Sequence, residues 1–242
     1  MAYTQLGSSI TANNTSDPVT NTFNIGSTCK LLVVSVIIEG NSVFGSDVTC
    51  DGVDMTLVGT VAATEGSSMQ WYIQNGDINT GVSKTVSVNN PNNDEMTIII
   101  SKFSVGAGKD SAFDTSNSNT GTSTAPSVTI SSPSTTSVQV DAMFHGYTST
   151  NLMTNNRTLL YKGAANASLY GAQYYLNGFG ISSTLSWSIR ISDDWCTIAG
   201  SWKEVDESDL AKHDTVAFSN IASVEGVLKA NIASVDGVLT GN

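Results

Sequence analysis

The side chains best suited to acid–base or metal chemistry are few in this chain and lie far apart. There are two histidines, His145 and His213, and three cysteines, Cys29, Cys50 and Cys196. No Cys-x-x-Cys pair occurs among them, so we expect no zinc site. His145 ends an alternating apolar run, which indicates a hydrogen-bonded histidine at a strand end rather than a general base.

Three pairs of neighbouring carboxylates could supply the two acidic groups that a sugar-cleaving enzyme needs. These pairs are Asp51 with Asp54, Asp94 with Glu95, and Asp193 with Asp194. Each pair also suits a turn, where Asp and Asn bond their own backbone. The Asn-rich stretch 89–95 could offer oxygen ligands to calcium, but it lacks the alternating ligand spacing of a calcium loop. Because no Gly-x-Ser-x-Gly motif occurs either, we predict a protein that is not an enzyme, with no catalytic residue, metal or cofactor.

Aromatic side chains could form a platform for a sugar ring. Tyr170 and Tyr174 share parity along one strand-like segment, so both could line one exposed face and contact a glycan. The alternative is that these rings pack in the core, as we expect for most aromatic residues that lie in strands. A glycan platform at Tyr170 and Tyr174 is therefore a hypothesis for the structure to test.

The elements that position these residues are expected to be strands. The chain has 242 residues, of which only 13% are charged, so Ser, Thr and Asn must supply most of its polar surface. Such a composition favours strands and turns over helices. The net charge of −11 disfavours nucleic acid and anionic membranes as partners. An odd number of cysteines without a secretory signal indicates reduced thiols in a protein made in the cytosol.

The hydrophobic pattern predicts about eleven or twelve short strands and no long amphipathic helix. Segment 30–38 is apolar on both faces, which indicates a central strand between two layers. Asp51-Gly52 marks a hairpin, and 106–126 is predicted to be a long loop within the domain. The expected fold is an all-β antiparallel β-sandwich with a jelly-roll-like arrangement over residues 1–204. A charged linker is predicted over 205–219.

The end of the chain, 220–242, repeats itself. Asn220–Ala230 and Asn231–Gly241 match at most positions with a spacing of 11 residues. Short strands, or single helical turns broken at each glycine, are favoured over one continuous helix, because glycine and β-branched residues weaken helices. Eight apolar side chains recur in the two copies: Ile221, Val224, Val227, Leu228, Ile232, Val235, Val238 and Leu239. So short a repeat cannot bury them alone, so we predict an assembly interface with other chains, with folding back onto the sandwich as the alternative.

A resemblance covers most of the chain. Segments 31–36, 48–58, 69–73, 98–104 and 195–202 resemble a β-sandwich common in virion proteins of tailed bacteriophages, and the motif Ile-x-x-Val-x-Gly-Val resembles short repeats near the ends of phage structural proteins. The resemblance implies a virion structural protein, a capsid decoration or head-fibre protein ahead of a tail protein. Its implied partners are other virion proteins and further copies of itself, as a homo-oligomer with a trimer favoured. The alternative is a carbohydrate-binding module for host surface glycans, with a glycan hydrolase third.

Overall fold

The structure is a computed structural model that divides the chain into two compact units, Met1–Glu204 and Val205–Asn242, which we call the body and the tail. The residues that it describes are 3–40, 48–78, 83–131, 134–146, 153–165, 168–177, 182–207, 223–224, 227–228, 234–235 and 238–239. The predicted all-β, antiparallel fold is confirmed, with one 3₁₀ helix, Asn75–Ile78, among the described residues.

Two inner sheets form the middle of the body. The first inner sheet contains β1 (Thr4–Gln5), β2 (Ile10–Asn14), β4 (Leu31–Glu39), β7 (Thr56–Ala62), β8 (Gly66–Gln74) and β10 (Met96–Ser104). The second contains β11 (Lys109–Ser123), β13 (Ser137–His145), β15 (Thr158–Ala165), β16 (Ser168–Asn177) and β18 (Asp193–Asp206). Their strand orders are β1-β10-β4-β8-β7, with β2 also paired to β10, and β11-β18-β13-β16-β15.

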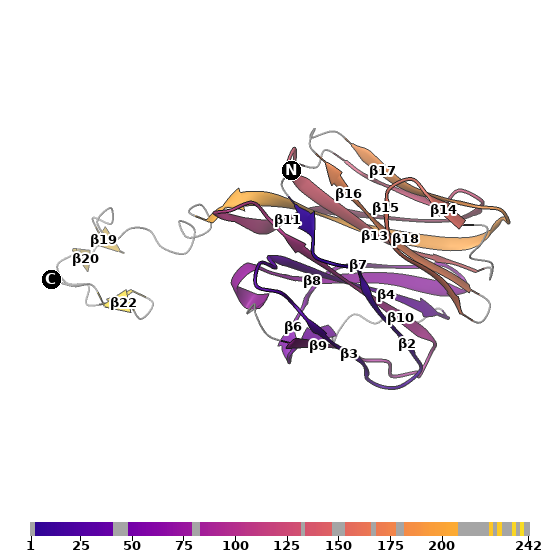
Figure 1. Cartoon of the computed structure of the whole chain (residues 1–242), viewed down its shortest axis with the longest axis horizontal. Coiled ribbons are helices and arrows are strands. Elements are labelled where there is room, and N and C mark those ends of the chain that lie inside the picture. The colour runs from indigo at the N-terminus through magenta and orange to yellow at the C-terminus, as the bar shows by residue number, and fades with distance from the viewer. Residues whose placement is uncertain are drawn as a thin grey trace. The chain divides into compact units, whose positions relative to one another are not determined.

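Each inner sheet is covered by an outer sheet, so the body has four layers (Figure 1). The first outer sheet contains β3 (Val19–Asn24), β5 (Val48–Cys50), β6 (Val53–Asp54) and β9 (Ser83–Val88), in the order β3-β9-β5-β6. The second contains β12 (Ser127–Ile130), β14 (Met153–Asn155) and β17 (Ser183–Ile189), in the order β12-β17-β14.

Strand β4 shows why the inner sheets are buried on both faces. Leu32, Val34 and Val36 pack in a cluster with the first outer sheet. Leu31 and Val33 point the other way and pack with residues of the second inner sheet. The prediction of a central strand between two layers is therefore confirmed. The body nevertheless holds two stacked sandwiches where the sequence predicted one, because both inner sheets carry apolar residues on the faces that meet.

The predicted loop at 106–126 is wrong, because most of it forms strand β11. This strand is polar because it lies at the edge of the second inner sheet. Two of its asparagines also hold the second outer sheet. The side-chain amide of Asn117 donates to the carbonyl of Thr129 at 2.8 Å, and that of Asn119 donates to the carbonyl of Ser127 at 2.9 Å. Strand β11 is therefore kept extended by hydrogen bonds from its side chains to a neighbouring backbone, rather than by burial of apolar side chains.

The body contains the same strand arrangement twice. The order β10-β4-β8-β7 corresponds to β18-β13-β16-β15, and β3-β9-β5 corresponds to β12-β17-β14, with the strands in the same succession along the chain. A β-bulge interrupts the equivalent hairpin in both halves, after Leu57 and after Leu159. We call β2 to β10 the first half and β11 to β18 the second half.

One further contact recurs in both halves and supports this equivalence. After β5, the backbone N–H of Asp51 donates to the carbonyl of Thr85, and the Asp51 carboxylate accepts the N–H of Thr85 at 2.7 Å. After β14, the N–H of Asn156 donates to the carbonyl of Ser186, and the Asn156 side-chain oxygen accepts the N–H of Ser186 at 2.9 Å. The two halves therefore match in strand order, in bulge position and in the tether between two outer strands.

Candidate functional site

The repeated segment of the tail forms the same small hairpin twice. Strand β19 (Ser223–Val224) pairs with β20 (Val227–Leu228), and β21 (Ser234–Val235) pairs with β22 (Val238–Leu239). The registers are identical after a shift of 11 residues, with Val224 opposite Val227 and Val235 opposite Val238. Of the two conformations that the sequence left open, the described residues therefore form short strands. Frequent valine and a glycine in each copy account for this choice over a helix.

The predicted assembly residues can now be placed on these strands. Six lie in the hairpins: Val224, Val227, Leu228, Val235, Val238 and Leu239. Ile221 and Ile232, together with 208–219 of the predicted linker, lie outside the described residues. A hairpin with strands of two residues is too small to be stable in water by itself. The two hairpins therefore need a surface to pack on.

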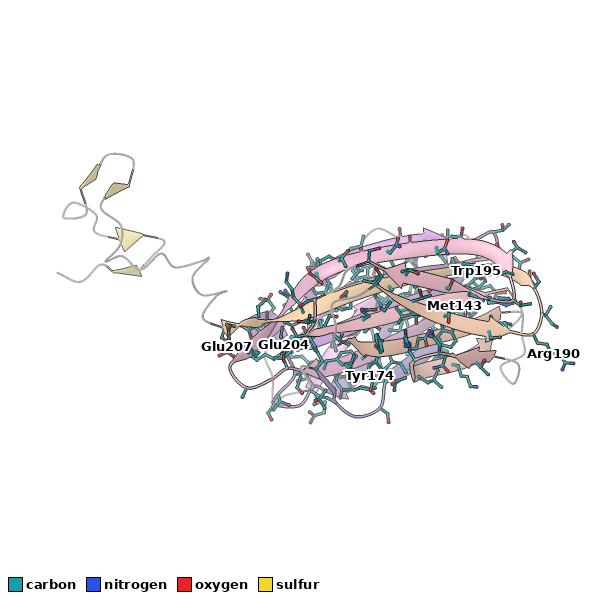
Figure 2. All side chains as sticks on the ribbon, turned by 90° about the horizontal axis from the view of Figure 1, so that it is seen from above. Met143, Tyr174, Arg190, Trp195, Glu204 and Glu207 are labelled. Carbon is teal, nitrogen blue, oxygen red and sulfur yellow. The ribbon has the colours of Figure 1, made fainter. Side chains whose placement is uncertain are left out.

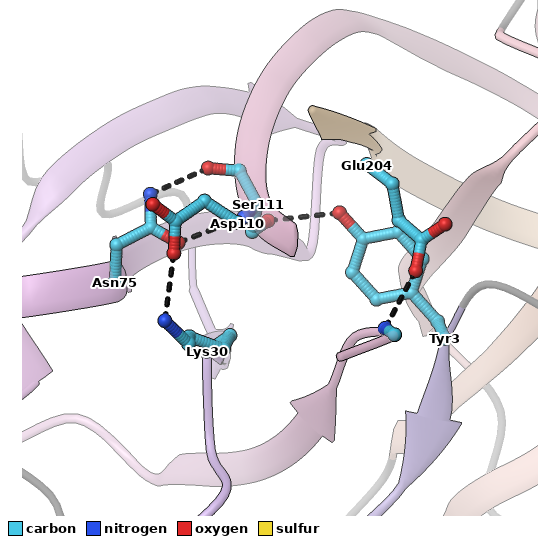
Figure 3. Close-up of polar contacts among 7 residues, drawn as sticks. Tyr3, Lys30, Asn75, Asp110, Ser111 and Glu204 are labelled. Atoms are coloured by element: carbon cyan, nitrogen blue, oxygen red, sulfur yellow. Dashed lines mark hydrogen bonds and ion pairs between the residues drawn. The ribbon is translucent and has the colours of Figure 1, made fainter. Parts of the chain in front are cut away.

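A polar network fixes the end of the body from which β18 leads into the tail (Figure 3). Asn75 and Ser111 bond each other twice: the Asn75 amide donates to the Ser111 carbonyl, and the Ser111 N–H donates to the Asn75 side-chain oxygen, both at 2.7 Å. Lys30 forms an ion pair with Asp110 at 2.8 Å. These bonds join the 3₁₀ helix and the start of β4 in the first half to β11 in the second half.

Two further bonds complete this network. The hydroxyl of Tyr3 lies 2.9 Å from that of Ser111. Burial raises the pKa of Tyr3 far above its ordinary value, against the effect of the Ser111 hydrogen bond, so the phenol stays neutral. The carboxylate of Glu204, near the end of β18, accepts the N–H of Gly106 at 2.7 Å. Glu204 and Arg190 lie at opposite ends of the body (Figure 2). Within this network, the strand that continues into the tail is held by the bond between its own Glu204 side chain and the backbone of Gly106.

The residues considered for catalysis are spread over the body. His145 is buried at the end of β13, as predicted, and its ring lies near the backbone of Ser123 and Ile191, although neither ring nitrogen forms a well-aligned hydrogen bond with a described residue. Burial lowers its pKa, while the charges of Asp193 and Asp194 act in the opposite direction. Hydrogen bonding to the backbone of Ile191 and Ser123 also acts to raise it. The predicted position at a strand end is confirmed, and the predicted hydrogen bond stays a prediction. His213 lies outside the described residues.

The carboxylate pairs carry out the turn chemistry that the sequence offered as the alternative to catalysis. Asp51 forms an ion pair with Lys84 at 2.7 Å, and this contact, with the bond from the Thr85 N–H, lowers its pKa. Asp194 accepts the backbone N–H groups of Thr64 and Glu65 and so holds the β7–β8 turn. No group of three or more His, Cys, Asp or Glu that could hold a metal ion occurs in the described ranges.

The Asn-rich loop before β10 and the cysteines also serve the fold. The Asn90 side chain donates to the carbonyl of Asp94 at 2.8 Å and accepts its N–H at 3.1 Å, which closes the loop. All three cysteines are free and buried, as expected for reduced thiols. Burial raises the pKa of both Cys29 and Cys196 to about 11, so these thiols stay protonated and unreactive.

The two tyrosines proposed for glycan contact share one face of β16, but that face points inward. Tyr170 is only 1% exposed and packs against Phe144 between the inner sheets. Tyr174 is half-buried, with its ring edge-to-face against Phe103 at 5.5 Å between centroids (Figure 2 labels Tyr174). The hypothesis of an exposed platform is wrong for Tyr170, because the first inner sheet covers this face.

Sequence reasoning did not single out Asp141, the one carboxylate among the fully buried charged or polar side chains of β13. It is 0% exposed and accepts three hydrogen bonds at 3.0 Å, from the N–H and the side-chain amide of Gln173 and from the indole N–H of Trp187. Burial raises its pKa to about 7, although these bonds lower it. The alternation of the sequence could have revealed this position. Along β13, Asp141 lies on the same face as Gln139 and Met143, which also face the second outer sheet.

Comparison with known protein families, curated proteins and solved structures finds no match for this chain. Within the described ranges, no helix has the length and apolar character needed to cross a membrane. The assignment of function therefore rests on the tail, on the body that presents it and on the resemblance carried by the sequence.

Proposed function

We propose that this chain is a non-enzymatic structural component of a bacteriophage virion, a capsid decoration or head-fibre protein that assembles through its tail. The observation that carries the proposal is the pair of tail hairpins with identical register. A hairpin that is too small to be stable alone can be stabilised by a partner that packs on it, and here the hairpin occurs twice. Other virion proteins and further copies of this chain are the proposed partners, with a trimer as the expected oligomer.

The energetics support an assembly role for the tail. Burying one Val, Leu or Ile side chain stabilises a complex by roughly 1.5–3 kcal/mol, before the entropy of ordering the segment is subtracted. Eight such side chains recur over the two copies of the repeat. Two equivalent units on one chain can also engage neighbouring subunits together, which raises the effective concentration of the second contact.

The strand order of the body supports a jelly-roll-like scaffold as part of this proposal. In the first half, the sets β2-β10-β4-β8 and β3-β9-β5-β6 alternate along the chain between two facing sheets. Two sheets that share eight strands in this interleaved way are typical of jelly rolls, which recur in viral capsid proteins. The fold alone does not assign a function, so the tail remains the basis of the proposal.

Truncation of the tail tests the proposal. A chain ending at Ser208 keeps β18 complete and lacks both hairpins. We expect it to stay folded, with unchanged circular dichroism, but to have the mass of a monomer by light scattering, while the full chain is a larger oligomer. The matched control keeps the tail length and replaces Val224, Val227, Val235 and Val238 by Ser.

The same truncation can be examined in the virus. If the full chain is present in purified particles by mass spectrometry, the truncated chain should be missing from them. An unchanged mass in solution, together with unchanged particle occupancy, would show that the tail is not the assembly element.

A further inference from the structure

The two hairpins of the tail have the same residues at every strand position. In each hairpin, Ser-Val pairs with Val-Leu, with one valine opposite the other and the serine opposite the leucine. The two copies of the repeat differ at three positions, 225/236, 229/240 and 230/241, and all three lie outside the strands. A partner surface that fits one hairpin therefore fits the other, so the partner should offer two equivalent sites.

The two hairpins are also close together along the chain. Five residues, 229–233, separate Leu228 at the end of β20 from Ser234 at the start of β21. A fully extended chain gains at most about 3.3–3.6 Å per residue, so Leu228 and Ser234 lie within roughly 20 Å of each other. The two equivalent sites on the partner must be similarly close.

Folded domains that stand side by side do not offer two equivalent sites at this distance. A domain of 100–200 residues has a radius of gyration of about 13–17 Å and is therefore about 30–40 Å across. Equivalent sites on adjacent domains of a particle surface repeat at about that distance. The short connection between the two hairpins does not span it.

The tail of a second copy of this chain does offer two such sites. It carries the same two hairpins with the same spacing, so both hairpins of one tail can pack on both hairpins of another. The repeat segment 220–242 has only 23 residues. Chains shorter than about 40 residues usually need disulfides, metals or oligomerisation to fold stably. The structure gives this segment no cysteine, and oligomerisation then supplies the missing core.

The distribution of charge along the chain favours contact between tails over contact between bodies. Glu225, Asp236 and Lys229 give the repeat segment a net charge of −1, whereas residues 1–219 carry the other −10 of the total of −11. Like charges oppose association, and a segment with little net charge lacks this opposition. Copies of the chain therefore repel one another least at the repeat segment.

We propose that the tails of several copies pack on one another in two layers, with one hairpin from each chain in each layer. This inference rests on the proposed function, which makes the tail the assembly element, and it names the partner as further copies of this chain. Hairpins related by one rotation axis form a closed oligomer in which each chain meets the same surroundings. The apolar residues of the two layers are Ile221, Val224, Val227 and Leu228, and Ile232, Val235, Val238 and Leu239.

Removal of one repeat tests the two layers. One variant lacks 220–230 and the other lacks 231–241, and each keeps the body, the segment up to Ser219 and one complete repeat followed by Asn242. We expect both variants to dissociate at a protein concentration at least about a hundredfold higher than the full chain, because half of the apolar contacts are lost. The two variants should agree with each other within about threefold, since the layers are equivalent. Sedimentation velocity over a range of protein concentrations measures the dissociation.

A matched control changes the repeat outside its strands. The double variant Glu225→Asp with Asp236→Glu exchanges the acidic residues of the two copies and should dissociate at the same concentration as the full chain. Circular dichroism checks that the body is folded in every variant. An unchanged dissociation concentration after removal of either repeat, or a loss from only one of the two removals, would overturn the proposal.

The full chain itself separates this inference from the proposed function. A full chain that is monomeric in solution but present in purified particles would overturn the contact between tails and leave the role in the virion intact. A tail that folds back on its own body would give this result. A full chain that assembles through both repeats but is absent from purified particles would instead overturn the role in the virion and leave the contact between tails intact.

Discussion

The two halves of the body share one strand order, but different kinds of side chain lie between the inner and the outer sheet of each half. In the first half, the interface between these two sheets, which we call the seam, contains Val34, Trp71 and Val86, all buried in one apolar cluster. In the second half, Asp141, Gln173 and Trp187 meet under the outer sheet and are joined by hydrogen bonds. Strand order and bulge position thus do not require an apolar seam. A buried polar interface instead needs each donor and acceptor to be matched.

The largest effect should come from placing the second-half residue in the first-half seam. Val34→Asp would bury a carboxylate opposite Trp71, in a cluster that offers no equivalent of the Gln173 amide. Burying an unpaired charge costs several kcal/mol, so we expect a loss of about 4 kcal/mol or more in the free energy of unfolding, or no folding. Urea denaturation monitored by tryptophan fluorescence measures this loss.

The reverse exchange, Asp141→Val, is the matched control. It removes the carboxylate and leaves the Trp187 indole N–H and the Gln173 backbone N–H without an acceptor, while the Gln173 amide keeps the Ser186 carbonyl. Each unsatisfied group costs roughly 1–3 kcal/mol. If Val34→Asp proved less damaging than Asp141→Val, the two seams would not differ in the way that their residues indicate.

The second-largest effect on stability is expected where the two halves pack against each other. Gly66 of the first half lies against Phe144 of the second half, and a Cβ atom at Gly66 would stand 2.2 Å from the Phe144 ring. Gly66→Ala must therefore displace a buried ring between the inner sheets, at a cost of about 1–3 kcal/mol. Thermal and urea unfolding would measure this change.

Gly76→Ala is the control for this substitution, since nothing lies within 4 Å of a Cβ atom at Gly76. Its effect should stay within about 0.5 kcal/mol. Equal effects at the two glycines would mean that the inner sheets are not closely packed at Phe144.

The positions of the strands can be predicted from the sequence better than the way in which the strands pair and pack. The two-faced apolar run of β4 indicates a central strand, and Asp51-Gly52 indicates the hairpin that pairs Cys50 with Val53. Strand β11 is missed because side-chain amides, rather than apolar burial, keep it extended. The duplication is hidden because equivalent positions hold unlike residues, such as Val34 and Asp141.

Among the candidate sites, too, some features can be predicted from the sequence and others appear only in the structure. The tail repeats are visible because they are adjacent and nearly identical, and the structure gives both copies one hairpin register. Asp141 is missed because a polar residue in an alternating strand is normally assigned to the solvent face. Only the sheet order shows that the second outer sheet covers that face, and that the first inner sheet covers the opposite face, where Tyr170 is buried.

The smallest effect on stability is expected at the contact between two outer strands that occurs in both halves. Asp51 accepts the Thr85 N–H just as Asn156 accepts the Ser186 N–H, but Asp51 alone adds an ion pair, with Lys84. Asp51→Asn would therefore give the first half the tether of the second: the bond to the Thr85 N–H remains and the ion pair is lost. The Asp51 side chain is 37% exposed, so solvent screens this pair in part, but the Lys84 side chain is only 7% exposed; the expected loss in the free energy of unfolding at pH 7 is about 1 kcal/mol.

The pH dependence of this variant separates the ion pair from the tether. The Lys84 contact and the Thr85 N–H lower the pKa of Asp51, so the stability from ionised Asp51 is present above its ordinary pKa and is lost as pH falls below it. The native chain should therefore lose its advantage over Asp51→Asn as pH falls below the ordinary Asp pKa of 3.8, as measured by urea unfolding at each pH. Asn156→Asp in the second half serves as the control, because Leu185 precedes Ser186 where Lys84 precedes Thr85. An acid-sensitive gain from Asn156→Asp as large as that from Asp51 would show that the backbone tether, and not Lys84, supplies the difference.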